Sequence, residues 1–467
     1  CLSTLPGLNL AKLAKRILSS AEIINRKSPG NKYSRFRKYV TSLDFVVHVA
    51  RLRHIGHFPA IIGDVDGVVM ASKLVLNWNM LLVQEANQRL FVFQGVTSCD
   101  AVFIPGKNTL IICCHITKEQ IMECLGQLSR APEFFHISKP RTFCGYLVGH
   151  SRPYHCNYDS LLALQRIKED GELLPSDELF SKSNEAFIDL GAGLALSQKH
   201  RCLSKEALNE LTETRQGYFM QLGYLFWDGG TIYDPCSLEL ASRVDESLRY
   251  YASTSSFLDR SGALDSLEKC KPLLWVGITG QKRSWIEQVD GTIHILNKLY
   301  DIYPNLGVVF DGWTPPLVNS DYHRLESRKD DKVIRDIIKG LDFRKNTCFG
   351  ILAGLPMLEK IRVGMSTDLF IANYLTGSLN VARICKKPGV GHLSNKKLIS
   401  KYQHIHSCTS EIDPLLVQDQ EDSQMGPGYM DYSVPWQAIY NELIDILACL
   451  PIEASKSLEK LCVPHGS

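Results

Sequence analysis

The sequence predicts an α/β fold with two domains, and three observations lead to that prediction. Short apolar runs alternate with helical patterns over residues 271–393, which is typical of a parallel sheet flanked by helices. A length of 467 residues suits two or three domains. The segment 58–117 is rich in short strands and adds β-structure to the first domain. The expected divisions are an N-terminal helix, a first α/β domain, a second α/β domain and a C-terminal loop with a helix, at residues 1–32, 33–260, 261–410 and 411–467.

The second domain carries the clearest pattern. Its first strand, at 271–278, ends in the turn Thr279-Gly280-Gln281-Lys282-Arg283. A helix is expected next, because apolar residues recur at helical spacing, at Ile286, Val289, Ile293 and Leu296. The following strand ends in Asp311. Ligands of parallel sheets bind beyond the carboxyl ends of the strands. We therefore expect Lys282 and Arg283, beside a helix N-terminus, to bind an anionic phosphate.

The first domain is expected to combine short β-strands with an α/β unit. Turn residues separate five β-type runs, at 58–62, 73–79, 90–94, 101–104 and 109–115. A helix is predicted at 118–128. Residues 143–148 then form a strand, which leads through a polar turn into a helix at 158–168. Further helices are expected within 186–260, and the segment 243–257 leads into the second domain.

Both ends of the chain are expected to contain a helix. Residues 8–28 place apolar side chains at helical spacing with basic residues between them, which predicts a basic amphipathic helix. We expect it to dock on its own domain, with peripheral contact to a membrane surface as the alternative. Residues 411–432 are rich in acidic and turn residues, which predicts a surface loop. The C-terminal helix at 434–449 is expected to pack back on the main part of the protein. The family resemblance described at the end of this section makes it a candidate to cross onto the first domain. Its apolar face would contain Trp436, Ile439, Ile444 and Leu447.

Composition argues against several classes of function. The 52 basic and 50 acidic residues leave a net charge of +2, which argues against a dedicated nucleic-acid binder. No apolar run reaches the roughly 20 residues that span a bilayer. Basic residues interrupt the N-terminal apolar pattern, so no signal peptide is expected. The 15 cysteines include no CxxC pair and no zinc-ligand spacing. We therefore expect reduced thiols, a cytoplasmic location and no metal site.

The main candidate for chemistry lies between the strand at 143–148 and the helix after it. This segment contains His150, Arg152, His155 and Asp159. A histidine, whose pKa is ordinarily near neutral, suits removal of a proton from an attacking hydroxyl. A carboxylate four residues on lies one helical turn away and can orient the imidazole. We expect His155 to act as the base, Asp159 to orient it, and Arg152 and His150 to contact an anion or the acceptor. A purely structural pair of His155 and Asp159 is the alternative.

Two segments carry a family resemblance. Residues 366–382 and 387–390 read STDLFIANYLTGSLNVA and KPGV. They resemble the C-terminal half of GT-B glycosyltransferases, most closely the heptosyltransferase-like group, which has a Thr-Gly turn, a histidine and then a Lys-Pro strand entry. Residues 152–164 also resemble the motif N-x-x-H-x-x-x-D-x-L-x-x-L of glycosyltransferases that modify proteins or polysaccharides.

The resemblance implies two Rossmann-like domains that face a cleft, the first binding an acceptor and the second a nucleotide-sugar. It implies sugar transfer to a hydroxyl of a glycan, a lipid-linked acceptor or a protein, in polysaccharide or glycoprotein synthesis, with no metal cofactor. In the family the Thr-Gly turn contacts the donor diphosphate, and Asn380 stands where the family has its histidine. The residues expected to bind the nucleotide-sugar are Thr279, Gly280, Lys282, Arg283, Asp311, Glu359, Thr376, Gly377 and Asn380.

Two other functions stay open on the sequence. Asp64 and Asp66 follow a short apolar run and resemble the first motif of haloacid-dehalogenase-type phosphatases, in which the first Asp is a nucleophile, the second an acid/base, and Mg²⁺ lies between them. Asn380 favours a non-catalytic GT-B-like protein that binds a nucleotide or a glycan. A Rossmann dehydrogenase is disfavoured because no GxGxxG motif follows a strand, and no P-loop is present.

Overall fold

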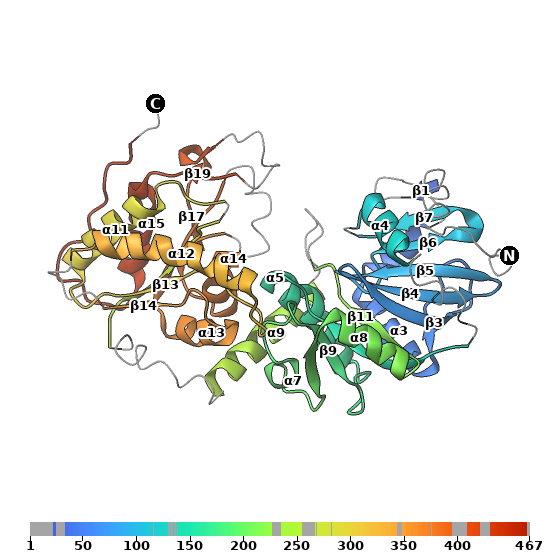
Figure 1. The fold of residues 1–467 in the computed structure, drawn as a ribbon. Coiled ribbons are helices and arrows are strands. Elements are labelled where there is room, and N and C mark those ends of the chain that lie inside the picture. The colour runs from blue at the N-terminus through green and yellow to red at the C-terminus, as the bar shows by residue number, and fades with distance from the viewer. Residues whose placement is uncertain are drawn as a thin grey trace. The chain divides into compact units, whose positions relative to one another are not determined.

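The chain forms two compact units (Figure 1). The structure is a computed structural model, and it describes residues 22–24, 33–114, 116–128, 134, 137, 139–226, 235–254, 267, 269–281, 283–342, 348–374, 376–394, 409–420 and 430–464. The first unit comprises residues 1–228 and 233–244, and the second comprises 229–232 and 245–467. The division therefore falls inside helix α9 (Pro235–Thr254), whereas the boundary expected from the sequence lies further along the chain.

The first unit contains a seven-stranded sheet with the order β1-β7-β6-β5-β4-β3-β2. Its strands are β1 (Glu22–Ile24), β2 (His57–Phe58), β3 (Gly67–Val75), β4 (Trp78–Glu85), β5 (Gln88–Gln94), β6 (Ala101–Ile104) and β7 (Thr109–Ile112). All neighbours pair antiparallel except β1, which runs parallel to β7. Helix α4 (Lys118–Leu128) packs Ile121, Leu125 and Leu128 into the same core as this sheet. The expected strand-rich segment and the helix at 118–128 are confirmed.

The predicted local structure is wrong in three places. The run 58–62 does not form a strand beyond Phe58, where β2 ends. The run 73–79 is not one strand, because the β3–β4 hairpin turns at Leu76 and Asn77, where Leu76 adopts φ 53°. The apolar alternation continues across this turn, so periodicity alone could not reveal it. At the N-terminus, Glu22–Ile24 form strand β1 instead of the end of a helix. These residues pair with β7, and the rest of the predicted helix at 8–28 lies outside the described residues.

A second sheet of the first unit has four parallel strands in the order β10-β9-β8-β11. The strands are β8 (Thr142–Val148), β9 (Leu179–Lys182), β10 (His200–Leu203) and β11 (Gly217–Leu222). The chain therefore leaves β8 toward one edge and later returns to its other side, so a topological switch point lies between β8 and β11. The helical segment after β8 is α5 (Pro153–His155), the π-helical η4 (Cys156–Leu161) and α6 (Leu162–Glu169). It begins five residues earlier than predicted, and proline is well suited to its first position.

The second unit is built on a six-stranded parallel sheet with the order β14-β13-β12-β15-β16-β17. Its strands are β12 (Leu273–Gly277), β13 (Gly307–Asp311), β14 (Cys348–Ile351), β15 (Leu369–Asn373), β16 (Gly389–His392) and β17 (Thr409–Glu411). Numbered in chain order this is 3-2-1-4-5-6, the order of doubly wound α/β sheets, with the switch point between β12 and β15. The predicted parallel sheet is confirmed. The predicted loop at 411–432 is wrong in part, since the sixth strand and a small β18 (Gln418–Asp419) to β19 (Tyr432–Ser433) pairing occupy its described ends.

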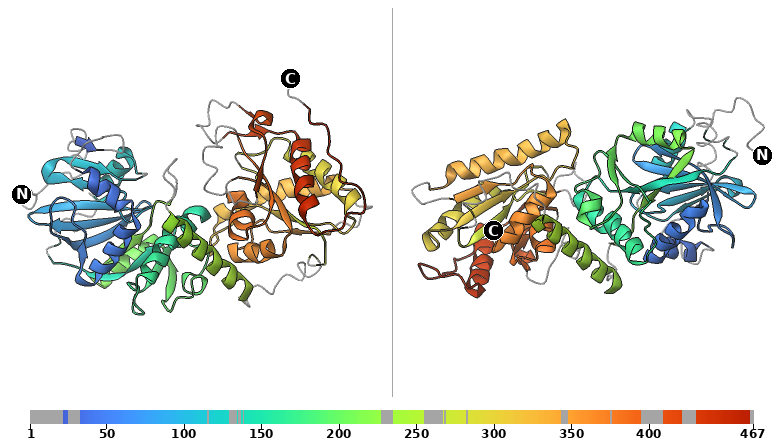
Figure 2. Two further views of the ribbon diagram at one scale, coloured as in Figure 1. Left: turned by 180° about the vertical axis from the view of Figure 1, so that it is seen from behind. Right: turned by 90° about the horizontal axis from the view of Figure 1, so that it is seen from below.

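Helices cover both faces of this sheet (Figure 2). One face shares a core with α11 (Gln288–Ile302), α12 (Asp321–Gly340) and α15 (Trp436–Cys449). The opposite face packs against α13 (Met357–Ser366) and the π-helical η6 (Leu379–Ile384), which continues from α14 (Thr376–Ser378). Because both faces are buried, the strands read as continuous apolar runs.

Helix α15 packs within the second unit. Its apolar face is buried in the core that α11 shares, as the sequence predicts, through Ile439, Ile444 and Leu447. Trp436 is half-buried and stacks on the ring of His294, with 5.1 Å between ring centroids. The apolar face of α15 is therefore buried in the core of its own unit. In the described part of the chain no helix is long and apolar enough to cross a membrane.

Candidate functional site

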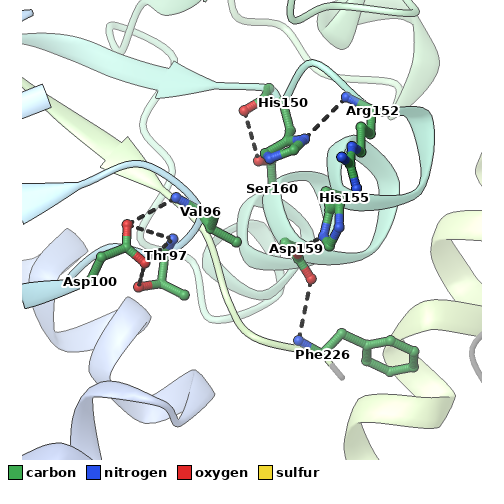
Figure 3. Close-up of polar contacts among 10 residues, drawn as sticks. Val96, Thr97, Asp100, His150, Arg152, His155, Asp159, Ser160 and Phe226 are labelled. Carbon is green, nitrogen blue, oxygen red and sulfur yellow. Dashed lines mark hydrogen bonds and ion pairs between the residues drawn. The ribbon is translucent and has the colours of Figure 1, made fainter. Parts of the chain in front are cut away.

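The residues predicted for catalysis meet at the carboxyl end of β8 (Figure 3). His155 Nδ1 lies 2.6 Å from Asp159 Oδ2, one helical turn further on. The Asp159 side chain is 2% exposed and that of His155 is 24% exposed. The pair therefore combines a buried carboxylate with an imidazole that reaches solvent. Asp159 lies in the π-helical segment η4, an irregularity that occurs often at functional sites.

The segment after β11 holds Asp159 in place. The Phe226 N–H donates to Asp159 Oδ1 at 3.3 Å, and the Tyr224 N–H donates to the Asp159 carbonyl at 3.1 Å. Both carboxylate oxygens are therefore engaged, one by the imidazole and one by the backbone. With Nδ1 bonded to the carboxylate, Nε2 of His155 is the nitrogen available to a substrate. This arrangement suits a general base whose tautomer is set by an acidic partner.

His150 and Arg152 lie beside this pair. The rings of His150 and His155 are 4.7 Å apart between centroids. The Arg152 backbone N–H donates to His150 Nδ1 at 3.1 Å, while the Arg152 side chain is exposed. The structure thus brings together all four residues that the sequence singled out in the first domain.

A loop from the antiparallel sheet, 95–100, lies against this site, and sequence reasoning missed it (Figure 3). Asp100 is fully buried and accepts from the backbone N–H groups of Gly95 at 2.6 Å and Val96 at 2.9 Å, and from the Thr97 hydroxyl at 3.0 Å. Burial raises the pKa of Asp100 to about 6, against the opposing effect of these hydrogen bonds. The Ser98 N–H donates to the carbonyl of Gly223 at 3.1 Å, so the loop is fastened to the segment that supports Asp159.

The contact at Gly223 requires glycine, and we expect Gly223→Ala to destabilise the first unit. A Cβ at this position would lie 2.0 Å from the carbonyl oxygen of Val96, which is backbone and cannot move alone. Overpacking of this kind costs about 1–3 kcal/mol. Chemical denaturation would measure the loss. Gly126→Ala in α4 is the matched control, because a Cβ there meets nothing within 4 Å and alanine favours a helix. Equal stability of the two variants would contradict the close contact.

Asp100 should also give the protein a pH-dependent stability. Its pKa is raised on folding, so the stability that it contributes is present below the unfolded value near 4 and is lost as pH rises through about 6. The difference in free energy of unfolding between wild type and Asp100→Asn should therefore shrink, by on the order of 2 kcal/mol, between pH 4 and pH 7. Urea titrations at several pH values measure it. A difference that is constant over this range would show that the carboxyl is not perturbed.

The second candidate region lies at the carboxyl ends of β12 and β15. Gln288 holds the backbone of Thr279, accepting from its N–H at 2.9 Å and donating to its carbonyl at 3.1 Å. Asn373, at the end of β15, donates to the Thr279 hydroxyl at 3.0 Å. A Cβ at Gly377 would lie 2.6 Å from Asn373 Oδ1. The predicted Thr279 loop and the Thr376-Gly377 turn are therefore joined through Asn373, which the sequence analysis did not single out.

The other residues predicted to bind the nucleotide-sugar lie on different elements of the second unit. Arg283 follows Thr279 and Gly280 in the loop and adopts φ 59°, and Lys282 lies outside the described residues. Glu359 is half-buried near the start of α13, and burial raises its pKa. Asn380 is 3% exposed in η6, and its Oδ1 is buried without a hydrogen-bond partner among the described residues. Thr376 begins α14, directly before Gly377.

The carboxylate of Asp311, which the sequence analysis assigned to the nucleotide-sugar site, is engaged in a buried ion pair. Its carboxylate is 2% exposed and pairs with Lys360 Nζ at 2.6 Å. Burial raises the pKa of Asp311, and the ammonium of Lys360 opposes that shift. Lys360 is itself buried and also donates to the carbonyls of Gly312 and Trp313 and to the Thr314 hydroxyl, at 2.8–3.0 Å. Asp311 and Lys360 therefore stabilise the loop after β13.

The Asp64–Asp66 motif has a different structural setting from that of the phosphatase family. It lies in a loop between β2 and β3, which pair antiparallel, and β2 is only two residues long. The Ala60 N–H donates to Asp66 Oδ1 at 3.0 Å. Glu85 accepts from three consecutive backbone N–H groups of the same loop, at 2.7–2.9 Å, those of Ile61, Ile62 and Gly63. These hydrogen bonds fold the segment that contains the motif into a tight loop, which explains its acidic and glycine residues without a metal site.

No known protein-family model matches this chain, and no curated protein is detectably similar to it in sequence. The class of protein is therefore defined by fold and site. It is a mixed α/β protein with two parallel sheets, each with a group of polar residues at the carboxyl ends of the strands that flank its switch point.

Proposed function

We propose that the protein is a glycosyltransferase of the GT-B type, which transfers a sugar from a nucleotide-sugar to a hydroxyl of a glycan, a lipid-linked acceptor or a protein. The observation that carries the proposal is the hydrogen-bonded pair of His155 and Asp159 at the carboxyl end of a parallel strand. Its geometry suits deprotonation of a hydroxyl. The 3-2-1-4-5-6 order of the second sheet supports a nucleotide site at its switch point, and the likeness of residues 366–390 to heptosyltransferase-like enzymes supports a sugar donor.

The reaction divides between the two groups of residues. The acceptor hydroxyl gives its proton to His155 Nε2, its oxygen bonds to C1 of the donor sugar, and the bond from C1 to the phosphate oxygen breaks. Asp159 stabilises the imidazolium that forms, through its 2.6 Å contact with Nδ1. The loop 279–283 and the Thr376-Gly377 turn bind the departing diphosphate through backbone N–H groups and basic side chains, which stabilise negative charge in the transition state. The role of Lys282 remains an expectation from the sequence, which places it in the turn between a strand and a helix, and the residue lies outside the described part of the chain.

A second candidate is a non-catalytic protein of the same fold that binds a nucleotide or a glycan. The observation that favours it is Asn380, which replaces the histidine of the family and is buried with an unpartnered Oδ1 among the described residues. An asparagine cannot supply the titratable group that a histidine offers at neutral pH. Turnover separates the two candidates, because both would bind the nucleotide.

The test is a thermal-shift series with UDP, GDP, ADP and CMP, followed by nucleotide release from the matching sugar nucleotide. A ligand that binds only the folded protein raises the midpoint of unfolding. We expect one nucleotide to raise the midpoint in wild type and much less in Arg283→Ala. Arg335→Ala is the matched control, since Arg335 is an exposed residue on α12. No shift with any of the nucleotides would overturn the proposal, and binding without turnover on any acceptor would favour the second candidate.

A further inference from the structure

We propose that Asp330 is a positioning residue that fastens the loop after β12, which the proposed donor site uses, to the loop after β13 and so holds it in its binding conformation. The inference rests on the proposed function of the sheet edge. Asp330 lies on α12 and is 2% exposed. It comes from neither of the loops, and neither the sequence patterns nor the family resemblance assigns it a role.

The carboxylate of Asp330 connects the loop after β12 to the loop after β13. The Gly280 N–H donates to Oδ1 at 2.7 Å, and the Trp313 N–H donates to Oδ2 at 2.6 Å. One side chain therefore accepts from the backbone of both loops, with one oxygen for each. Hydrogen bonds from a neutral donor to an ionised acceptor are short and strong, which fits these distances.

The packing around the carboxylate leaves room only for glycine in both loops. A Cβ at Gly280 would lie 2.8 Å from the backbone of Lys329 and 3.0 Å from Asp330 Oδ1. A Cβ at Gly312 would lie 2.7 Å from Asp330 Oδ2. The two loops thus approach the same helix as closely as a backbone can. The close packing at both glycines and the two hydrogen bonds therefore each hold the loops against α12.

The surrounding charges make the contact sensitive to pH. Asp311 on β13 and Lys360 on α13 act on Asp330 from the neighbouring elements, and Lys329 and Glu326 lie next to it on α12. Burial raises the pKa of Asp330 to about 6; the two backbone hydrogen bonds and Lys360 oppose that shift and Asp311 adds to it. Because folding raises this pKa, the stability that the carboxyl contributes is present below about pH 4 and is lost as the pH rises through about 6. The loops should therefore loosen as the pH rises.

The test compares Asp330→Asn with wild type by hydrogen–deuterium exchange and by titration with UDP, GDP, ADP and CMP. The amide of asparagine keeps the shape but offers one acceptor oxygen in place of two. Asp336→Asn is the matched control, because Asp336 lies on the same helix and forms a surface ion pair with Lys339. We expect faster exchange at Gly280 or Trp313 in Asp330→Asn only. We also expect the dissociation constant of the bound nucleotide to rise about tenfold, as the loss of one charge-assisted hydrogen bond predicts.

A pH series gives the second readout. From pH 5 to pH 7.5 the wild-type affinity should fall more than that of Asp330→Asn, and the protonation of the nucleotide itself cancels in this comparison. If Asp330→Asn does not fold, Gly280→Ala replaces it, since the added Cβ separates the same loop from α12. Unchanged exchange, or unchanged nucleotide affinity in a wild type that binds, overturns the role of Asp330 while the proposed function stands. A wild type that binds none of the nucleotides overturns the proposed function instead.

Discussion

Replacing His155 with alanine is expected to lower the rate of sugar transfer by about 10²–10⁴-fold, the usual contribution of a general base. The acceptor hydroxyl would then have no group to take its proton. Asp159→Asn should also slow the reaction, because the amide cannot stabilise an imidazolium through the 2.6 Å contact with Nδ1. Release of the nucleoside diphosphate measures the rate, with the donor and acceptor at saturating concentration.

The affinity for the nucleotide provides the internal control. The loops proposed to bind the donor belong to the second unit, so His155→Ala should bind the nucleotide as wild type does. His54→Ala is the matched control for the loss of an imidazole, since His54 is an exposed histidine of the first unit. Full activity in His155→Ala would remove this residue from the mechanism. A loss of nucleotide affinity in that variant would point to misfolding.

Replacing Lys360 with methionine is expected to lower the free energy of unfolding by about 3–5 kcal/mol. The variant leaves the carboxylate of Asp311 buried without its ion-pair partner, and it removes the donor to two backbone carbonyls and the Thr314 hydroxyl. An uncompensated charge in a buried site is more costly than the loss of the ion pair itself. Urea or guanidinium unfolding, followed by a probe in the second unit, measures the loss.

The double variant Lys360→Met with Asp311→Leu distinguishes this cause from a general packing defect. Removing both charges should recover a large part of the stability, because no unpaired charge remains. Lys339→Met, in an exposed ion pair with Asp336, is the surface control and should cost less than about 1 kcal/mol. A double variant as unstable as Lys360→Met would show that the hydrogen bonds to the loop after β13, and not the buried charge, dominate.

The sequence predicted those helices and strands in which apolar residues recur at regular spacing. The alternation of strands and helices in the second domain and the helix at 118–128 depend on apolar spacing, and the structure contains both. The pair of His155 and Asp159 was predictable for the same reason, because two residues one helical turn apart must lie close together if the segment is helical.

Contacts between distant segments were not predictable from such patterns. Asp330 touches Gly280 and Trp313, Asn373 touches Thr279, and Asp100 organises a loop beside the segment that supports Asp159. One signal was present in the sequence, since Asp330 lies at helical spacing with Ile334 and Ile337, on the buried face of α12. A charged residue on such a face must find buried partners, but the sequence does not say which loops supply them.

The sequence by itself determined the α/β class, the parallel order of the second sheet's elements and the catalytic candidates that lie one helical turn apart. Only the tertiary structure decided that Asp311 is neutralised by Lys360, that Asp64 and Asp66 lie in a turn of an antiparallel sheet, and that α15 packs in its own unit. The physical reason is that periodicity reports which face of an element is buried. The partner that neutralises a buried charge, or completes a buried backbone hydrogen bond, is chosen by the packing of segments far apart in the chain.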